Sequence, residues 1–462
     1  MTQATQVISK FSANLRFADL PSPIQNSLIH FALDYFRVAS IGERMEWSEW
    51  GRNYAKGTAG KGSSPVLFSD VLYDPVSASF INTLYAGSLD ADDVHVGAML
   101  HPGCIMFSTG LAIGQARHQS GAEVLAAIAA GYEAMIRLAL CIQPSHFGRG
   151  FQSTSTMGVF GAAVTAAKLI FPGAAGEKSI AASLGIAASF AGGLTQFYHS
   201  GSTVKRLHAA QAASSGTKAA LLVESGFTGP HDIFEGKDGF ARAYADAVDY
   251  SLLENDLGKI FRIAEVAVKP HACSARVLSA IEASTEILSQ SAFDSSEIES
   301  IYLGIPKVIQ GRLTTNHPAD LQAAQMSAPF AVALSLLRKS TNSNFSLGVD
   351  DFVRGLQNPE LMRVTQLVKC ELDDEVEKTS SEESVSAKLI VTLKNGQKLS
   401  AFVVSPKGSI ARPFTLEDHI ARAESELISR LPESRLHQLI DAIVALPTMS
   451  DVAQLGQLIK AT

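Results

Sequence analysis

The chain of 462 residues is 46% hydrophobic and 18% charged, which is enough apolar material for a sizeable core and too little charge for a disordered protein. Its 38 lysines and arginines face 45 acidic residues, so we expect no basic surface that could hold a nucleic acid. The 4 cysteines are scattered without a CxxC pair, which argues against structural zinc, an iron–sulfur cluster and a disulfide framework.

The start of the chain carries no apolar run of the kind that a signal peptide needs. The apolar stretch at residues 181–194 is rich in small side chains and too short to span a bilayer. Cysteines without a disulfide framework are typical of a reducing compartment. We therefore expect a cytoplasmic protein with no membrane partner.

Helices are predicted almost throughout residues 5–260, because apolar residues recur there at spacings of three and four. Residues 24–42 and 123–143 show this pattern most clearly. The segments at 158–170, 180–194 and 208–223 are unusually rich in Ala, Gly and Ser, and small side chains let helix backbones approach closely. We expect these three segments to form central helices that pack on one another.

The pattern changes near residue 269. Residues 299–306, 365–373 and 384–406 are predicted strands, with a two-residue type I′ hairpin turn at Asn395-Gly396. A helix is predicted at 326–340, and helical periodicity returns after residue 413. The sequence thus predicts a mainly α protein, in which a large all-α domain (1–267 plus 407–462) is interrupted by a smaller α+β lid domain at 268–406.

Acidic and imidazole side chains gather between two apolar helices at residues 90–101. Asp90, Asp93 and His101 would suit a loop that lines a polar pocket, where a carboxylate orients a histidine acting as general base. A solvated loop with aspartate caps is one alternative. A metal site is another, although the spacing matches no familiar metal-binding motif.

Two further polar clusters are candidates for binding. Lys205 and His208 lie three residues apart at the start of an Ala-rich helix, where cations and a helix N-terminus favour a bound carboxylate. Lys269 and His271 lie where the helical pattern gives way to strands, and domain junctions often hold pockets. A polar helix start and an ordinary linker are the alternatives. The sequence contains no dinucleotide fingerprint or phosphate-binding loop, so we expect no cofactor and no bound metal.

Six segments carry a pattern that is similar to one known family. They are LDADDVHVGAMLHPG (89–103), GRGFQSTSTMGVFGAA (148–163), GSTVKRLHAAQAASSG (201–216), GFTGPHDIFEGKDGF (226–240), VKPHACSARVLSAIEA (268–283) and QMSAPFAVA (325–333). In this order they resemble the MmgE/PrpD family, which includes 2-methylcitrate dehydratase, cis-aconitate decarboxylase and iminodisuccinate epimerase. The resemblance implies an all-α domain built from both chain ends, an inserted α+β lid and a homodimer.

The resemblance also implies an active site between the domains. It assigns catalytic roles to Asp90, His101 and Lys269, while Lys205 and His208 would hold carboxylates of a small polycarboxylate substrate. Three more residues are predicted to bind the substrate, namely Gln152, Asp93 and His271.

Two departures from the family pattern bear on the reaction. Gln152 stands where the family usually has His, and Phe330 stands where Tyr is common, so two candidate acids for a departing hydroxide are lost. An epimerase needs only two groups that take and return the α-proton, and cations that stabilise the enediolate-like intermediate. We therefore predict an isomerase, most like iminodisuccinate epimerase, in which His101 and Lys269 are opposed bases and Asp90 orients His101.

Two other functions stay open. The chain could be a hydro-lyase or decarboxylase of a tricarboxylate such as 2-methylcitrate or cis-aconitate, with water or another residue as the acid. It could also be a non-enzymatic member that binds a polycarboxylate or a protein partner. A test for turnover distinguishes the lyase from the binding protein, because a binding protein is expected to be stabilised by its ligand without converting it.

Overall fold

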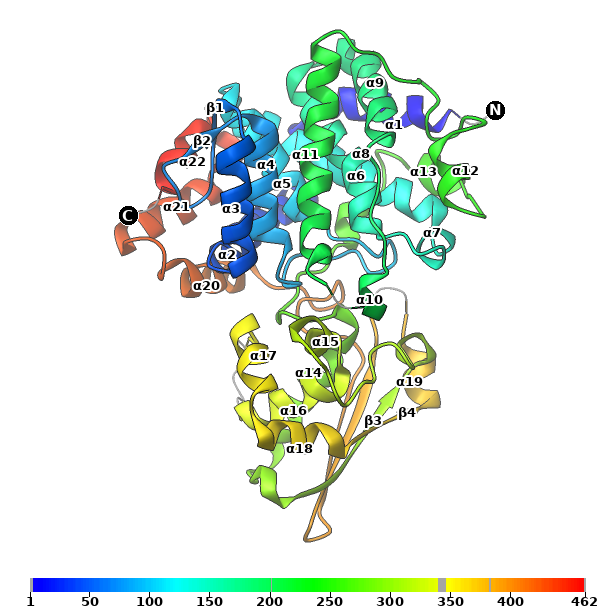
Figure 1. Ribbon diagram of the computed structural model, residues 1–462, viewed down its shortest axis with the longest axis vertical. Coiled ribbons are helices and arrows are strands. Elements are labelled where there is room, and N and C mark those ends of the chain that lie inside the picture. The colour runs from blue at the N-terminus through cyan, green and yellow to red at the C-terminus, as the bar shows by residue number, and fades with distance from the viewer. Residues whose placement is uncertain (1–2, 201, 340–345, 382–383, 461–462) are drawn as a thin grey trace. The chain divides into compact units, whose positions relative to one another are not determined.

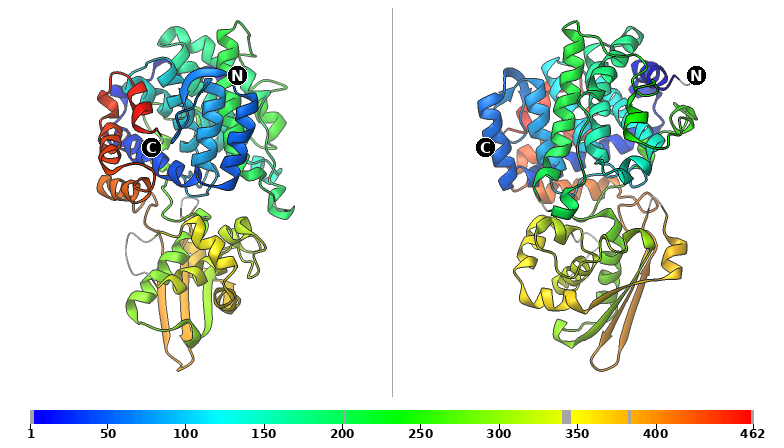
Figure 2. Two further views of the ribbon diagram at one scale, coloured as in Figure 1. Left: turned by 60° about the vertical axis from the view of Figure 1, so that its left-hand side comes forward. Right: turned by 45° about the vertical axis from the view of Figure 1, so that its right-hand side comes forward.

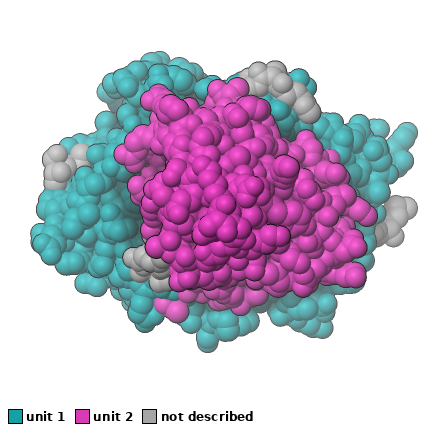
Figure 3. All heavy atoms as spheres, turned by 90° about the horizontal axis from the view of Figure 1, so that it is seen from below, with its two compact units in different colours: residues 1–88, 92–266, 416–462 teal, residues 89–91, 267–415 magenta. Residues whose placement is uncertain are grey.

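The computed structural model describes residues 3–200, 202–339, 346–381 and 384–460, which fold into two compact units (Figure 1). Unit 1 comprises residues 1–88, 92–266 and 416–462, and unit 2 comprises residues 89–91 and 267–415 (Figure 3). Helices predominate, with two short sheets in the described residues, which confirms the predicted mainly α class. Residues 89–91 were not expected in the smaller unit; in unit 2 the side chain of Lys269 binds Asp90.

Unit 1 is built almost entirely of helices. Their bounds are α1 (Ala4–Asn14), α2 (Ser22–Gly42), α3 (Glu46–Thr58), α4 (Pro75–Gly87), α5 (Gly103–Ala116), α6 (Gly121–Ile142), α7 (Ser145–Gly148), α8 (Ser153–Ile170), α9 (Glu177–Ala188), α10 (Phe197–Ser200), α11 (Val204–Glu224), α12 (Phe240–Tyr244), α13 (Ser251–Glu254), α20 (Leu416–Leu427), α21 (Glu433–Val444) and α22 (Ala453–Leu458). A 3₁₀ helix, η3, spans Arg262–Glu265.

The centre of unit 1 is α8, which packs against both α6 and α11. Small residues allow this packing: a Cβ at Gly216 of α11 would lie 2.4 Å from the backbone oxygen of Val159 in α8, and one at Gly131 of α6 would lie 2.0 Å from Thr165 Oγ1. Such distances are far below contact distance, so only glycine fits at these two positions. The close helix approach inferred from the Ala/Gly/Ser-rich segments is confirmed for α8 and α11.

One helix, α6, is long and apolar enough to cross a membrane by length and composition, but 94% of its most apolar window is buried inside the structure. The helix packs against α8 and α5. An apolar helix buried on all sides is typical of the core of a large helical protein. Among the described residues, α6 is the helix that comes nearest to a membrane span. The apolar stretch at 181–194 is not a single helix, because α9 already ends at Ala188.

A two-stranded antiparallel sheet lies in unit 1 within residues 5–260, where helices were predicted almost throughout and no strand was expected. It consists of β1 (Lys61–Pro65) and β2 (Leu72–Tyr73). The strands are short and β1 reads KGSSP, without the β-branched alternation by which strands are recognised in a sequence.

Unit 2 contains a four-stranded sheet with strand order β4-β3-β5-β6. Strand β3 is parallel to β4 and antiparallel to β5, and β5 is antiparallel to β6. Figure 2 shows helices α14, α16 and α18 on one face of this sheet. The bounds are β3 (Ile298–Ile305), β4 (Val368–Leu372), β5 (Ala387–Leu393), β6 (Lys398–Val403), α14 (Leu278–Gln290), α15 (Leu321–Gln325), α16 (Ala328–Arg338), α17 (Val349–Leu356), α18 (Pro359–Leu367) and α19 (Asp374–Thr379).

The hairpin between β5 and β6 forms where the sequence predicts it, but with a different turn. Gly396 has φ +86°, whereas Asn395 does not have a positive φ. The Gly396 N–H bonds to the oxygen of Leu393, and the Leu393 N–H bonds to the oxygen of Gln397. This is the three-residue loop with a left-handed glycine, in place of the predicted type I′ turn, which needs two positive φ angles.

Candidate active site

The segment between α4 and α5 carries most of the polar candidates. It is irregular, and two of its non-glycine residues have left-handed backbones: Asp90 with φ 58° and Met99 with φ 56°. A left-handed backbone costs an ordinary residue about 1–2 kcal/mol. Strain of this kind collects at functional sites, where the surrounding structure holds it in place.

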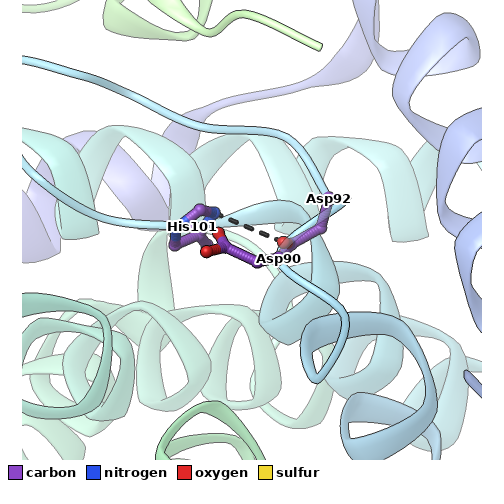
Figure 4. Close-up of side chains that lie close together, drawn as sticks. All are labelled: Asp90, Asp92 and His101. Atoms are coloured by element: carbon purple, nitrogen blue, oxygen red, sulfur yellow. Dashed lines mark ion pairs between the residues drawn. The ribbon is translucent and has the colours of Figure 1, made fainter. Parts of the chain in front are cut away.

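His101 lies at the end of this segment, in unit 1. Its Nδ1 is 2.8 Å from the backbone oxygen of Asp93 and 3.4 Å from Asp92 Oδ1 (Figure 4). Because a carbonyl oxygen can only accept, Nδ1 carries a proton and donates it. The neutral ring therefore has its basic nitrogen at Nε2, which is the atom that can take up or deliver a proton.

Asp93 is held from two sides in the interior of unit 1. Tyr132 of α6 donates to Asp93 Oδ2 at 2.7 Å, and the backbone N–H of Gly103 donates to Oδ1 at 2.8 Å. Burial, followed by the charge of Asp92, raises the pKa of Asp93 to about 8. Both carboxylate oxygens are occupied inside the protein. This arrangement favours a positioning role for Asp93 over the predicted contact with substrate, which stays a prediction.

The tip of the same segment is fixed by His95. Its Nδ1 accepts from the Ala98 N–H at 3.1 Å, so Nε2 carries the proton and donates to Glu265 Oε2 at 3.0 Å. Arg262 holds the other oxygen of Glu265 at 2.6 Å. Burial alone would raise the pKa of Glu265, but the hydrogen bonds from His95 and Arg262 outweigh it and keep that pKa below its usual range. The hydrogen bond between His95 and Glu265 thus links the loop to η3.

Lys205 and His208 lie in the first two turns of α11, at the helix start that the sequence predicts. The side chain of His208 is buried, and its Nδ1 has no hydrogen-bond partner among the described residues. Burial and the charge of Lys205 lower the pKa of His208 to about 4, so the ring is neutral at pH 7. Lys205 is half-buried. Gly201, the first residue of the family segment at 201–216, lies outside the described residues.

Gln152 forms the N-cap of α8. Its Oε1 accepts from the Ser155 N–H at 2.7 Å, which places the side chain at a helix start inside unit 1. An amide in this position shapes the helix end and keeps its Nε2 group as a donor.

In unit 2, Lys269 Nζ donates to Asp90 Oδ1 at 2.6 Å. The Lys269 side chain is 0% exposed and that of Asp90 is 7% exposed. An ammonium bonded to a carboxylate supplies positive charge and not a free electron pair, so this geometry favours an electrostatic role for Lys269 over its predicted role as a base. Within unit 1, the carboxylate that pairs with His101 is that of Asp92. The role of Asp90 in orienting His101 stays a prediction.

His271 and Cys273 are also buried in unit 2. His271 Nδ1 accepts from the Leu347 N–H at 3.0 Å, so its proton is on Nε2, and the ring fixes the start of the segment before α17. Burial raises the pKa of the Cys273 thiol, which keeps it protonated and argues against a nucleophilic role.

The predicted residues thus fall into three groups. His101 lies with Asp92 and Asp93, and Lys205 lies with His208; both groups belong to unit 1, as does Gln152. Lys269 and Asp90 form the third group, in unit 2. Two residues with roles in these groups were missed. The sequence pointed to Asp92 through its place in the acidic segment, whereas nothing in the apolar helix α6 pointed to Tyr132.

Metal ligands are present in principle. Asp92 and His101 could provide two, and Asp90, two residues earlier in the chain, carries a further carboxylate (Figure 4). That carboxylate is already bound by the ammonium of Lys269. Its charge is thus balanced inside unit 2 without an ion.

Two family models match most of the chain. The MmgE/PrpD N-terminal domain matches residues 6–253, and the MmgE/PrpD C-terminal domain matches residues 271–446. The chain belongs to the MmgE/PrpD family.

Curated relatives align with nearly the whole chain. A cis-aconitate decarboxylase-like protein, oryM, from Aspergillus oryzae is 24% identical and covers 99% of this chain and 97% of its own length. A cis-aconitate decarboxylase from Aspergillus terreus is 24% identical over 99% and 96%. The cis-aconitate decarboxylase of Homo sapiens is 24% identical over 93% and 88%.

Proposed function

We propose that the protein is a lyase that acts on a small unsaturated tricarboxylate, and that decarboxylation of cis-aconitate or a close analogue is its reaction. The observation that carries this proposal is the alignment of 99% of the chain with relatives named as cis-aconitate decarboxylases. It favours the lyase alternative over the epimerase that the sequence suggested.

The geometry of unit 1 supports a proton transfer of the kind that a decarboxylase needs. When a carboxylate leaves as CO₂, the C–C bond breaks and its electron pair moves into the adjacent conjugated system, where a carbon must take up a proton. His101 presents Nε2 for this step because Nδ1 donates to Asp93. Lys205, beside the N-terminus of α11, would hold a remaining carboxylate.

The two departures that suggested an epimerase carry less weight in the structure. Phe330 is fully buried among the apolar residues of unit 2 and packs against Phe352, with ring centroids 6.0 Å apart. Gln152 caps α8. Decarboxylation also needs no acid for a departing hydroxide, so the absence of His and Tyr at these positions is compatible with it.

The test is product analysis in D₂O by NMR, with CO₂ measured in parallel, for cis-aconitate, 2-methylcitrate and iminodisuccinate. We expect CO₂ and one carbon-bound deuterium per turnover from cis-aconitate. His101→Gln should lower kcat by about 10²–10⁴-fold, the usual contribution of a general acid or base. His437→Gln, on the exposed face of α21, is the matched control and should leave kcat unchanged.

Other outcomes would replace the proposal. Deuterium exchange at the α-carbon of iminodisuccinate without CO₂ would indicate the epimerase. Formation of a conjugated alkene from 2-methylcitrate would indicate a hydro-lyase. Binding without turnover of any of the three would indicate a non-enzymatic member.

The homodimer and the cytoplasmic location stay predictions. We propose the dimer from the resemblance alone, and light scattering coupled to size exclusion tests it, since the chain mass is 49.0 kDa. A mass near one chain at micromolar concentration would contradict it.

A further inference from the structure

We propose that Tyr132 is a positioning residue for His101, acting through Asp93. The inference rests on the proposed function only in taking His101 as the proton-transferring group. None of the comparisons assigns a role to Tyr132, and the sequence gave no reason to single it out.

The first step is the geometry of Asp93, which is bound at three points. Its carboxylate accepts from the Tyr132 hydroxyl at 2.7 Å and from the Gly103 N–H at 2.8 Å, while its backbone oxygen accepts from His101 Nδ1 at 2.8 Å. Holding the carboxylate holds the Cα of Asp93, and the Gly103 contact ties that residue to the start of α5, two residues after His101. Both ends of the hydrogen bond between the Asp93 carbonyl and the imidazole are therefore held in the same place.

The second step is the rigidity of Tyr132 itself. It is fully buried in α6, its ring stacks on Phe31 with centroids 5.8 Å apart, and it meets the edge of Phe107 at 6.4 Å. A hydroxyl on such a ring has little freedom, so its hydrogen bond is preorganised. The core of unit 1 thereby sets the position of Asp93, which lies in a loop 39 residues before Tyr132 in the sequence.

The third step is the fit at Gly103. A Cβ at this position would lie 2.6 Å from both Asp93 Oδ2 and the Tyr132 hydroxyl oxygen. The first residue of α5 can therefore approach the pair only as glycine. The start of α5, two residues after His101, is built around the Asp93–Tyr132 contact.

The fourth step concerns the two contacts at the Asp93 carboxyl, from the Tyr132 hydroxyl and the Gly103 N–H, whose role is geometric. An asparagine can make both, accepting from Gly103 with Oδ1 and donating to the phenol oxygen with Nδ2.

The experiment is the ¹⁵N NMR spectrum of histidine-labelled protein, with the His101 signals assigned from their loss in His101→Gln. In the unchanged protein we expect neutral His101 to carry its proton on Nδ1. In Tyr132→Phe we expect a mixture of tautomers, with kcat lowered about tenfold or more and KM within twofold. Tyr35→Phe is the matched control, because it removes an equally buried hydroxyl that bonds Ser108 at 3.0 Å, away from the loop.

Asp93→Asn is the second variant and keeps the proposal testable if Tyr132→Phe folds poorly. It should keep the Nδ1–H tautomer, since its amide can replace both contacts, and a mixture of tautomers in this variant would contradict the geometric role. Unchanged tautomer and kcat in Tyr132→Phe would overturn the proposal, as would a kcat loss in Tyr35→Phe equal to that in Tyr132→Phe. If the tautomer shifts as expected but no substrate is turned over by any form, the proposed function fails while the positioning role stands.

Discussion

Asp90 adopts a left-handed backbone, which glycine adopts at lower cost, yet its carboxylate is needed to bind Lys269 in unit 2. The left-handed backbone costs about 1–2 kcal/mol, and glycine would remove that cost. Glycine would also leave Lys269 buried without its carboxylate, and an uncompensated buried charge costs more than the strain. The balance of these two terms explains an aspartate in a position that favours glycine.

Asp90→Asn separates charge from shape at this position, because Asn tolerates the left-handed backbone. Breaking a buried pair by removing one partner costs about 3–5 kcal/mol, so we expect a loss of that order in the free energy of unfolding in urea. The double variant Asp90→Asn/Lys269→Met should recover part of it. Asp19→Asn, in the exposed pair with Arg16, is the control and should change nothing measurable. A loss for Asp90→Asn no larger than that of the control would contradict the prediction.

Asp93 makes a prediction for pH dependence. Its pKa is about 8 in the folded protein and near 3.8 when unfolded, so the folded state binds the proton more tightly between these values. Stability due to this group is therefore full at low pH and falls as pH rises, by up to about 1.4 kcal/mol per pH unit, levelling off above pH 8.

Asp93→Asn cannot ionise and should not show this fall. Its unfolding midpoint relative to the unchanged protein should rise steadily from pH 5.5 to pH 8 and then stay constant. Glu224→Gln, in a solvent-exposed pair with Arg117, is the control. A constant difference between Asp93→Asn and the unchanged protein across this range would show that Asp93 is ionised throughout.

At the scale of elements, the loop between α4 and α5 is held in place by hydrogen bonds within the loop and to its neighbours in unit 1. His95 and Leu100 pair in both directions, with N–O distances of 2.9 and 3.3 Å, and the hydrogen bond from His95 to Glu265 links this bridge to η3. η3 is in turn bound to the core, since the Ile263 N–H donates to Glu133, which pairs with the fully buried Arg137. The loop is thus anchored to α6 at a second place.

Glu265→Gln should loosen this anchor without unfolding unit 1. An amide can still accept from His95, but the charge-assisted bonds from His95 and Arg262 are lost, and such bonds are about twice as strong as neutral ones. We expect faster hydrogen exchange at the amides of Ala98 and Leu100, with exchange in α8 unchanged. Equal exchange in variant and unchanged protein would show that His95 does not depend on Glu265.

How far the sequence leads differs between elements. Long helices such as α2 and α6 follow from their periodicity, and α11 was predicted from its small side chains. The hairpin of β5 and β6 follows from alternation around Asn395-Gly396. The short strands β1 and β2 do not follow, because β1 reads KGSSP, without strand-favouring residues, and β2 is only two residues long. The turn geometry at Asn395 was also beyond the sequence, since one dipeptide serves two loop lengths.

At the scale of the whole molecule, the residue types of the candidate site follow from the sequence and their partners do not. Asp90 and Lys269 are 179 residues apart, and Asp93 and Tyr132 are 39 apart, so only the folded structure shows which side chains bind each other. The resemblance named Asp90, His101 and Lys269, and their catalytic roles stay predictions; the pairing of Asp92 with His101 appears only in the folded structure.

Binding of a polycarboxylate should stabilise the whole protein, because a ligand that binds only the folded state adds RT ln(1 + [L]/Kd), about 2.7 kcal/mol at a hundredfold excess over Kd. We expect cis-aconitate to raise Tm and propionate, with one carboxylate, to raise it far less. Lys205→Met should remove most of the rise, since one carboxylate loses its cation. Lys218→Met changes an exposed lysine on the same helix, α11, and should keep it. An equal rise in both variants would remove Lys205 from the binding site while leaving the family assignment untouched.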